Sequence, residues 1–290
     1  MKKYLILVFI IVSTGLHLEE SRPLLGIKEI NAFDNGDLCP NASSDKFLHR
    51  FILVDVSGGL RLDQIELIKR LVLSKSQLEE LKPWDKISIM LLGLNNPTEV
   101  RPIFSKCRPR SGNPRSPYKE DQPRRLYENA AELKAVYKIF EKGVEEAINE
   151  ITNVVTSGKS VKGVGSPLFG QIKEISRLPD LDFTKASGYE TRELIIISDL
   201  MQNTTKIPFY DLCKKKCQSW EKFKSNSRHR IWVKAAMPSD FGQGLAVDLI
   251  YLNTFEDPNL DKGVVEFWMN YMEEAKIPFR NFEIESDFGR

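Results

Sequence analysis

The sequence has few of the residues on which many enzyme active sites depend, and it has no large excess of charge. It contains three histidines among 290 residues, His17, His49 and His229. His17 lies in an apolar leader, so a serine triad would have to use His49 or His229, and no G-x-S-x-G motif accompanies them. The 42 basic and 40 acidic residues give a formal net charge of +2, which creates no global field for nucleic acid. We therefore expect neither a triad hydrolase nor a nucleic-acid-binding protein.

Long apolar runs are missing beyond the N-terminus. The first residues, MKKYLILVFIIVSTGLHLEE, place two lysines before an apolar run that ends near Leu18 and is followed by two glutamates. This layout predicts a secretory signal peptide over residues 1–18, and an uncleaved N-terminal membrane anchor is the alternative. The run is short for a membrane span, which needs about 20 apolar residues. We expect an exported protein, either periplasmic or extracellular, or one anchored with its domain outside and touching the membrane only through this segment.

Cysteine is also sparse, with four residues: Cys39, Cys107, Cys213 and Cys217. An even number in an exported chain favours disulfides, for which three pairings are possible. The segment FYDLCKKKCQSW is interpreted as helical, so that Cys213 and Cys217 would share one helix face. A zinc site is disfavoured because this segment supplies no other soft ligand, and core thiols or disulfide partners are the expected roles.

Apolar residues are abundant, and their spacing predicts a regular alternation of strands and helices. Strands are predicted at 51–56, 85–94, 99–107, 193–200, 230–237 and 246–255, and helices at 62–81, 128–155, just after 167, 208–224 and 259–275. Pro102 removes a ladder donor, so the third strand should lie at an edge. Strands that are apolar on both faces and separated by helices predict a doubly wound α/β fold, with a mostly parallel six-stranded sheet and helices on both faces.

This pattern divides the chain into a short N-terminal part and one domain. Residues 19–47 are polar and irregular and are interpreted as a linker or N-terminal extension, and residues 48–290 as a single domain. Residues 107–127 interrupt the alternation with four prolines, five arginines and one lysine. We interpret this basic, proline-rich insertion as an exposed, solvated loop, and contact with an acidic partner, lipid head groups or nucleic acid is the alternative.

Two predicted strands end in an aspartate, Asp55 and Asp199. Such a residue often only caps the next helix. In an open α/β sheet, however, ligands bind beyond the carboxyl ends of the strands, at the point where the strand order reverses. The segments DVSGG, GVGSPL and SDLMQNT could bring these carboxylates together with the hydroxyls of Ser57 and Ser166. Such oxygen ligands suit Mg²⁺, Ca²⁺ or Mn²⁺ and do not suit zinc.

At these residues the chain resembles the von Willebrand factor A (VWA) domain family. The metal-ion-dependent adhesion site of that family combines a D-x-S-x-S motif after a strand, a threonine in a T-P-L loop, and an aspartate often followed by glycine. The resemblance assigns Asp55 and Ser57 to the first motif, Ser166 to the threonine position and Asp199 to the last aspartate. The site would be partly degenerate, because Gly59 stands in place of the second motif serine and Leu200 in place of the glycine.

The resemblance covers residues 48–280 and implies that the edge strand is antiparallel. Phe267, Trp268 and Tyr271 in the last helix are similar to the pattern in uncharacterised bacterial proteins of this class. The resemblance implies a non-enzymatic module that captures a carboxylate of a partner protein through Mg²⁺ or Mn²⁺. One alternative is a metal-independent VWA scaffold in an assembly. Another is a magnesium-dependent, haloacid-dehalogenase-like phosphohydrolase, which would need a second acid where Ser57 stands.

Overall fold

The structure is a computed structural model that describes residues 36–40, 47–57, 60–92, 102–124, 128–157, 168–177, 189–201, 203–204, 207–238, 245–253 and 258–285. The expected signal or anchor at 1–18 and most of the linker lie outside these residues. No helix within the described ranges is long and apolar enough to cross a membrane.

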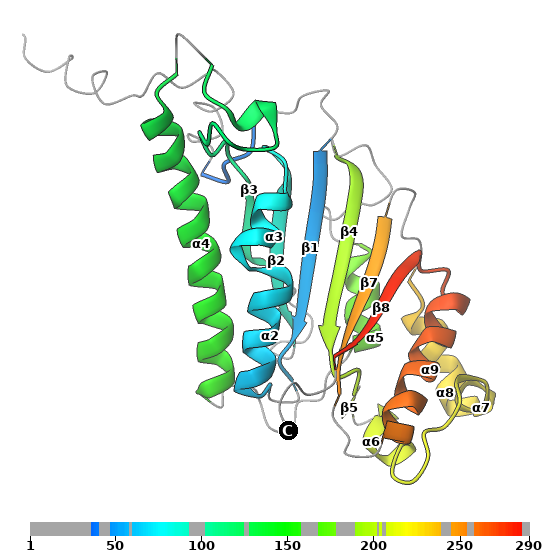
Figure 1. The fold of residues 1–290 in the computed structure, drawn as a ribbon. Coiled ribbons are helices and arrows are strands. Elements are labelled where there is room, and N and C mark those ends of the chain that lie inside the picture. Colours follow the sequence, from blue (N-terminus) through cyan, green and yellow to red (C-terminus); the bar gives the residue numbers. More distant parts are fainter. Residues whose placement is uncertain are drawn as a thin grey trace, which may run out of the picture.

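A six-stranded sheet forms the centre of the domain, in the order β3-β2-β1-β4-β7-β8 (Figure 1). Its strands are β1 (Phe47–Asp55), β2 (Lys86–Leu92), β3 (Pro102–Cys107), β4 (Tyr189–Ser198), β7 (Leu245–Leu252) and β8 (Phe279–Glu285). β3 pairs with β2 in the antiparallel sense, and all other neighbours are parallel. The predicted α/β class, the six-stranded sheet and the antiparallel edge strand are confirmed.

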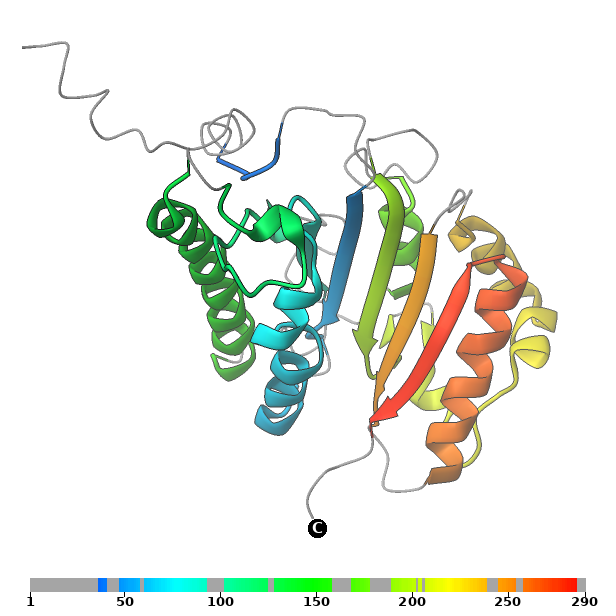
Figure 2. The ribbon, with the colours of Figure 1, turned by 45° about the horizontal axis from the view of Figure 1, so that its top comes forward.

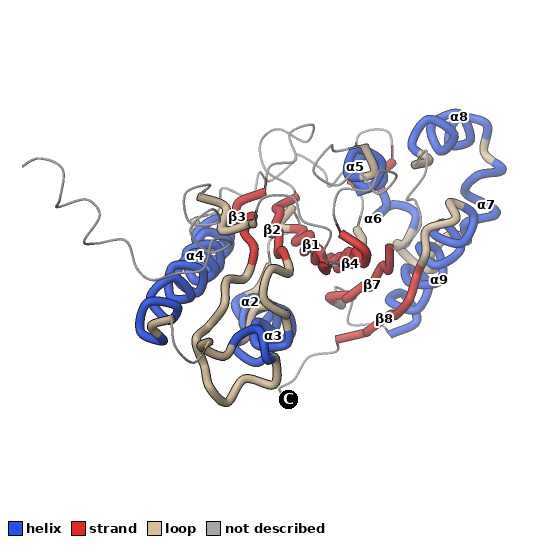
Figure 3. Tube along the Cα trace, turned by 90° about the horizontal axis from the view of Figure 1, so that it is seen from above, coloured by secondary structure: helices blue, strands red, loops and turns tan. Residues whose placement is uncertain are grey.

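Two groups of helices cover the two faces of the sheet (Figure 3). One face carries α2 (Leu62–Val72), α3 (Lys75–Glu80) and α4 (Ala130–Thr156), and the other carries α5 (Leu168–Ile175), α6 (Phe209–Leu212), α7 (Trp220–Ser225), α8 (Ser227–Ala236) and α9 (Pro258–Glu274). Along β1, Ile52 and Val54 pack with the first group, whereas Phe51 and Leu53 pack with the second. Because side chains alternate along a strand, the apolar run of β1 supplies both cores at once.

The sixth strand is not the one that the sequence predicted. Residues 230–236 belong to α8, and Met237 follows its last residue. The helix begins after Asn226, whose side chain accepts a hydrogen bond from the N–H of Arg228. Of the apolar side chains described there, Val233 is buried and Ile231 is 75% exposed. The run is therefore part of a surface helix with a short apolar face. The true sixth strand, β8, carries charged residues among its phenylalanines, and this hid it from a search for apolar runs.

The helix predicted at 208–224 is broken into two. Two short antiparallel strands, β5 (Asn203–Thr204) and β6 (Ile207–Pro208), lead into α6. The helix α7 starts only after Ser219, whose hydroxyl accepts a hydrogen bond from the N–H of Lys222. Cys213 and Cys217 lie between these helices and form a disulfide, and Cys39 pairs with Cys107. The expectation of disulfides is confirmed, and the shared helix face was wrong.

The basic segment 107–127 is not an exposed loop throughout. Arg108 and Arg110 are 2% and 3% exposed. Arg108 donates two hydrogen bonds, of 2.9 and 2.7 Å, to Asp121 in the short 3-10 helix η1 (Lys119–Asp121), and Arg110 pairs with Glu128 at 2.7 and 2.8 Å. These arginines hold the segment onto the domain, because each guanidinium matches a carboxylate in a two-pronged geometry.

Candidate metal centre

The point where the strand order reverses lies between β1 and β4. The chain leaves β1 toward β2 and leaves β4 toward β7, on opposite sides of this junction. β1 and β4 are parallel neighbours in which Val54 pairs with Ile197. Their carboxyl ends therefore emerge side by side at one edge of the sheet (Figure 2). This is the position at which open α/β sheets bind their ligands.

Asp55, the last residue of β1, is 3% exposed and surrounded by hydroxyl groups. Its Oδ1 accepts hydrogen bonds from the backbone N–H of Ser57 at 3.0 Å and from the Ser57 hydroxyl at 2.6 Å. Its Oδ2 accepts a hydrogen bond of 2.8 Å from the hydroxyl of Ser198. These donors hold the carboxylate in one orientation at the end of the strand, since a buried carboxylate is stable only when its oxygens are paired.

Ser198 is the last residue of the neighbouring strand β4, and Asp199 follows it directly. The buried hydroxyl of Ser198 also accepts a hydrogen bond of 2.8 Å from the backbone N–H of Leu200. Oδ1 of Asp199 accepts from the N–H of Met201 at 2.9 Å, which forms a local turn. Asp199 is half-buried, whereas Asp55 is buried. The two carboxylates thus lie at adjacent strand ends, the second closer to solvent than the first.

The turn that follows Asp199 has an unusual backbone. Leu200 has a φ of 56° and is fully buried. A non-glycine residue in this left-handed region costs about 1 kcal/mol or more. The carbonyl oxygen of Leu200 accepts a hydrogen bond of 2.8 Å from the indole N–H of Trp268 in α9. Leu200, which stands where the VWA motif often has glycine, therefore adopts a glycine-like conformation, and its surroundings hold it there.

Two neighbouring carboxylates, Asp55 and Asp199, concentrate negative charge at the candidate centre. Burial, together with the neighbouring charge of Asp55, raises the pKa of Asp199 to about 7. Burial and then the charges of Asp199 and Asp55 raise the pKa of Tyr210, in α6, to about 12. Tyr210 is 40% exposed, so its phenol lies at the rim of the centre. A cation placed here would relieve the repulsion between the carboxylates.

The structure brings together three of the four residues predicted from sequence: Asp55, Ser57 and Asp199. The fourth, Ser166, lies outside the described residues, as does Gly59. Two residues were missed. Ser198 precedes Asp199 directly, and its position at a strand end could have indicated it. Tyr210 had no signal in the sequence, because only the fold places α6 at this edge.

The oxygen atoms at this edge of the sheet are ligands that suit a hard divalent cation. Two carboxylates and the hydroxyls of Ser57 and Ser198 provide oxygen atoms only, as Mg²⁺ and Mn²⁺ prefer. Within the described ranges no group of three or more His, Cys, Asp or Glu side chains could hold a metal ion. The ion would therefore depend on hydroxyl groups and water in addition to the two aspartates.

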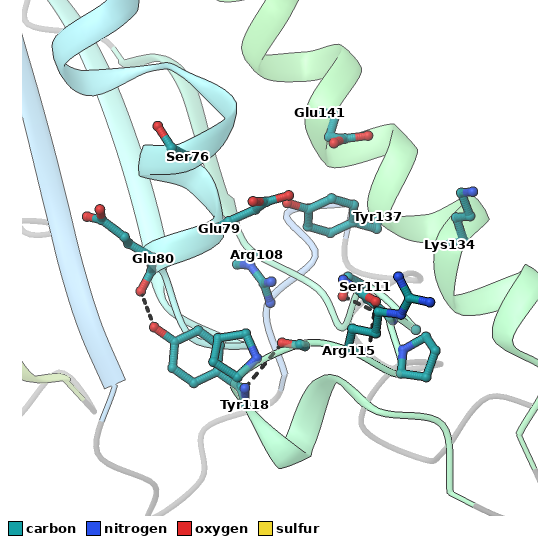
Figure 4. A pocket seen from close by; sticks show the side chains of 15 residues that line it. Ser76, Glu79, Glu80, Arg108, Ser111, Arg115, Tyr118, Lys134, Tyr137 and Glu141 are labelled. Atoms are coloured by element: carbon teal, nitrogen blue, oxygen red, sulfur yellow. Dashed lines mark hydrogen bonds between the residues drawn. The ribbon is translucent and has the colours of Figure 1, made fainter.

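A separate hollow of about 660 Å³ lies between α3, α4 and the segment that follows β3 (Figure 4). Arg108 and Tyr137 contribute to its lining, and the guanidinium carbon of Arg108 lies 5.1 Å from the centroid of the Tyr137 ring. Its rim carries both signs of charge, with Glu79 and Glu141 opposite Arg115. This mixed rim favours no single ligand charge, in contrast to the candidate metal centre.

No protein-family model matches this sequence, and no curated protein matches it. The resemblance to the VWA family therefore stays a prediction. It depends on Asp55, Ser57, Ser166 and Asp199 and on the order of the elements.

Proposed function

We propose that this protein is a non-enzymatic, VWA-type binding module that captures an acidic residue of a partner protein through a divalent cation. Asp55, Ser57, Ser166 and Asp199 would hold Mg²⁺ or Mn²⁺. The remaining coordination position would accept a carboxylate of the partner. The disulfides that join the four cysteines agree with an exported protein, because such bonds persist in oxidising compartments.

The observation that carries the proposal is the pair of carboxylates at the ends of β1 and β4. Asp55 is buried and already orders two serine hydroxyls, and Asp199 lies beside it with a raised pKa. Folding has placed two like charges at a ligand-binding edge of the sheet, which costs stability in the absence of a cation. A divalent cation would offset that cost, and its charge would then attract an acidic partner.

The phosphohydrolase alternative has less support. Its nucleophile would be Asp55, but both oxygens of that carboxylate accept hydrogen bonds from serine hydroxyls. The general acid expected two residues later is Ser57, whose hydroxyl donates to the same carboxylate. A serine hydroxyl is a poor proton donor to a leaving alcohol compared with a carboxylic acid.

The experiment is thermal unfolding with and without 5 mM Mg²⁺ or Mn²⁺, after treatment with EDTA. An ion that binds only the native state at about one hundred times its Kd adds roughly 2.7 kcal/mol to the free energy of unfolding. We expect a rise in Tm that Asp199→Asn and Asp55→Asn abolish. The control is Asp63→Asn, an exposed acid of α2 that pairs with Arg61; it should keep the full rise.

Two results would contradict the proposal. One is a Tm that does not change with either metal. The other is hydrolysis of p-nitrophenyl phosphate in the presence of Mg²⁺ that disappears in Asp55→Asn, which would support the phosphohydrolase.

A further inference from the structure

We propose that a basic groove beside the Cys213–Cys217 disulfide binds an acidic segment of the same partner protein. The groove consists of the disulfide ring, residues 213–217, the start of α7 and the first turns of α9. This inference extends the proposed function, because it assigns to the partner a stretch of acidic residues in addition to the one that reaches the metal. Its contacts nevertheless involve none of the metal ligands, so the two ideas can fail separately.

The ring displays a run of lysines. Lys214, Lys215 and Lys216 lie between the two bonded cysteines, and all three are exposed. Cys213 and Cys217 are 0% and 8% exposed. The buried disulfide therefore closes a five-residue ring whose polar part can point only to solvent. A ring this short restricts the backbone that carries the three lysines, so less backbone entropy is lost when a partner binds them.

The ring is also held against α9. A Cβ atom added at Gly263 would lie 2.7 Å from the Cβ of Cys217, closer than real side chains approach. The Sγ of Cys217 lies 3.4 Å from the carbonyl oxygen of Leu260. Glycine at position 263 is what lets the disulfide approach the helix, so the lysine run rests on a rigid support.

A hollow of about 1000 Å³ separates the ring and α7 from the first turns of α9. Four lysines contribute to its lining, Lys215, Lys216, Lys222 and Lys262, against two acids, Asp211 and Glu266. Asp211 pairs with Lys214 at 2.7 Å, and Glu266 lies 3.8 Å from Lys262. Lys215, Lys216 and Lys222 have no carboxylate partner among the residues that the structure describes. The amino end of α9, where the helix dipole is positive, lies at the same hollow.

The groove lies at the same end of the domain as the metal centre. α6 and the start of α9 stand at the edge to which the strands point (Figure 1). Tyr210 lies next to both regions. It is the neighbour of Asp211 in α6, and burial followed by the charges of Asp199 and Asp55 raises the pKa of its phenol. One extended partner segment could therefore reach both the groove and the metal.

The lining favours an acidic protein segment over other polyanions. The aromatic ring that contributes to the lining, Phe267, is 1% exposed, so it offers no face on which nucleic-acid bases could stack. Leu212 and Leu260 pack partly against the core, which leaves little apolar side chain for insertion into a membrane. A hollow lined by lysine ammonium groups suits carboxylates on an extended chain.

The experiment measures the binding of fluorescent hexaglutamate by anisotropy at low salt with Mg²⁺ present. We expect Lys215→Glu/Lys216→Glu to weaken binding at least tenfold, because two favourable charges become repulsive. The matched control reverses two exposed lysines of α4, Lys138→Glu/Lys142→Glu, which leaves the net charge of the chain equal to that of the test variant. Binding should also weaken with rising salt, because the contacts are exposed to solvent.

Each outcome separates the groove from the metal centre. Equal affinity of the test and control variants would overturn the groove. So would tighter binding of a 20-base-pair DNA or of phosphatidylserine vesicles than of hexaglutamate. If binding survives EDTA and Asp199→Asn but fails in the lysine variant, the groove stands and the metal-dependent function falls. If EDTA abolishes binding and the lysine variant matches its control, the metal alone holds the peptide and the groove is wrong.

Discussion

The hydroxyl of Ser198 donates a hydrogen bond of 2.8 Å to the carboxylate of Asp55, from a position 143 residues later in the chain. The same hydroxyl accepts the backbone N–H of Leu200. One side chain thus ties the end of β1 to the turn that carries Asp199. The two strand ends of the candidate centre are therefore joined directly, and not only through the ladder between them.

Replacing Ser198 should weaken both the fold and the centre. Ser198→Ala leaves a buried carboxylate oxygen and a buried N–H without this partner, which costs about 1–3 kcal/mol of unfolding free energy. Urea denaturation measures the loss. Ser57→Ala is the control, because Ser57 is half-buried and water can take over its hydrogen bonds; it should cost less. An equal loss in the two variants would contradict the tie between the strands.

The contribution of Asp199 to the stability of the metal-free protein should fall as pH rises from about 4 to 7. The pKa of Asp199 is raised to about 7, so in this window the native state binds more protons than the unfolded state. The free energy of unfolding then decreases as pH rises. Asp199→Asn should flatten this part of the pH profile measured by urea denaturation, and saturating Mg²⁺ should do the same. If the unsubstituted protein and Asp199→Asn gave the same pH profile of unfolding free energy, the raised pKa would be contradicted.

Substitutions at Leu200 separate backbone strain from packing. Both Leu200→Ala and Leu200→Gly remove a fully buried side chain, at a cost of about 2–5 kcal/mol. Glycine also relieves the left-handed backbone, for which φ is 56°, and so recovers about 1 kcal/mol. We expect the glycine variant to be the more stable of the two in thermal unfolding. The opposite order would show that the turn relaxes once the side chain is gone.

The buried pair of Arg108 and Asp121 should be sensitive to the loss of one partner. Their side chains are 2% and 0% exposed. Burial by itself would raise the pKa of Asp121, but hydrogen bonds from Arg108, Ser111 and Ser116 lower it. Asp121→Asn leaves the guanidinium without its counter-charge and should cost about 3–5 kcal/mol. The exposed pair Arg61–Asp63 is the control, and Asp63→Asn should change stability little.

The two disulfides should differ in what they contribute. Cys39–Cys107 joins residues 68 apart in sequence, and Cys213–Cys217 joins residues four apart. The chain-entropy estimate gives about 4 kcal/mol for the first and about 2 kcal/mol for the second. Denaturation of the two double-serine variants tests this order. The shorter ring should instead affect the binding of hexaglutamate, because it positions the lysines.

Local sequence determined the features that depend on a few neighbouring residues. The apolar runs predicted five of the six strands, because a strand buried on both faces must be apolar throughout. The aspartates that end two of those runs marked the edge at which the candidate centre lies. The chain also showed why β3 is an edge strand, since proline removes a ladder donor.

Tertiary structure decided everything that depends on pairing distant residues. Ser198 became part of the centre because the register of β4 against β1 places its hydroxyl at Asp55. The sequence predicts a solvated Arg108, whereas packing places Asp121 beside it and buries both. The strand β8 formed from a mixed sequence because β7 presented an open edge with which to pair. Such contacts form only when the whole chain folds. A local sequence pattern therefore cannot predict which distant residue will pair in a hydrogen bond or a strand ladder.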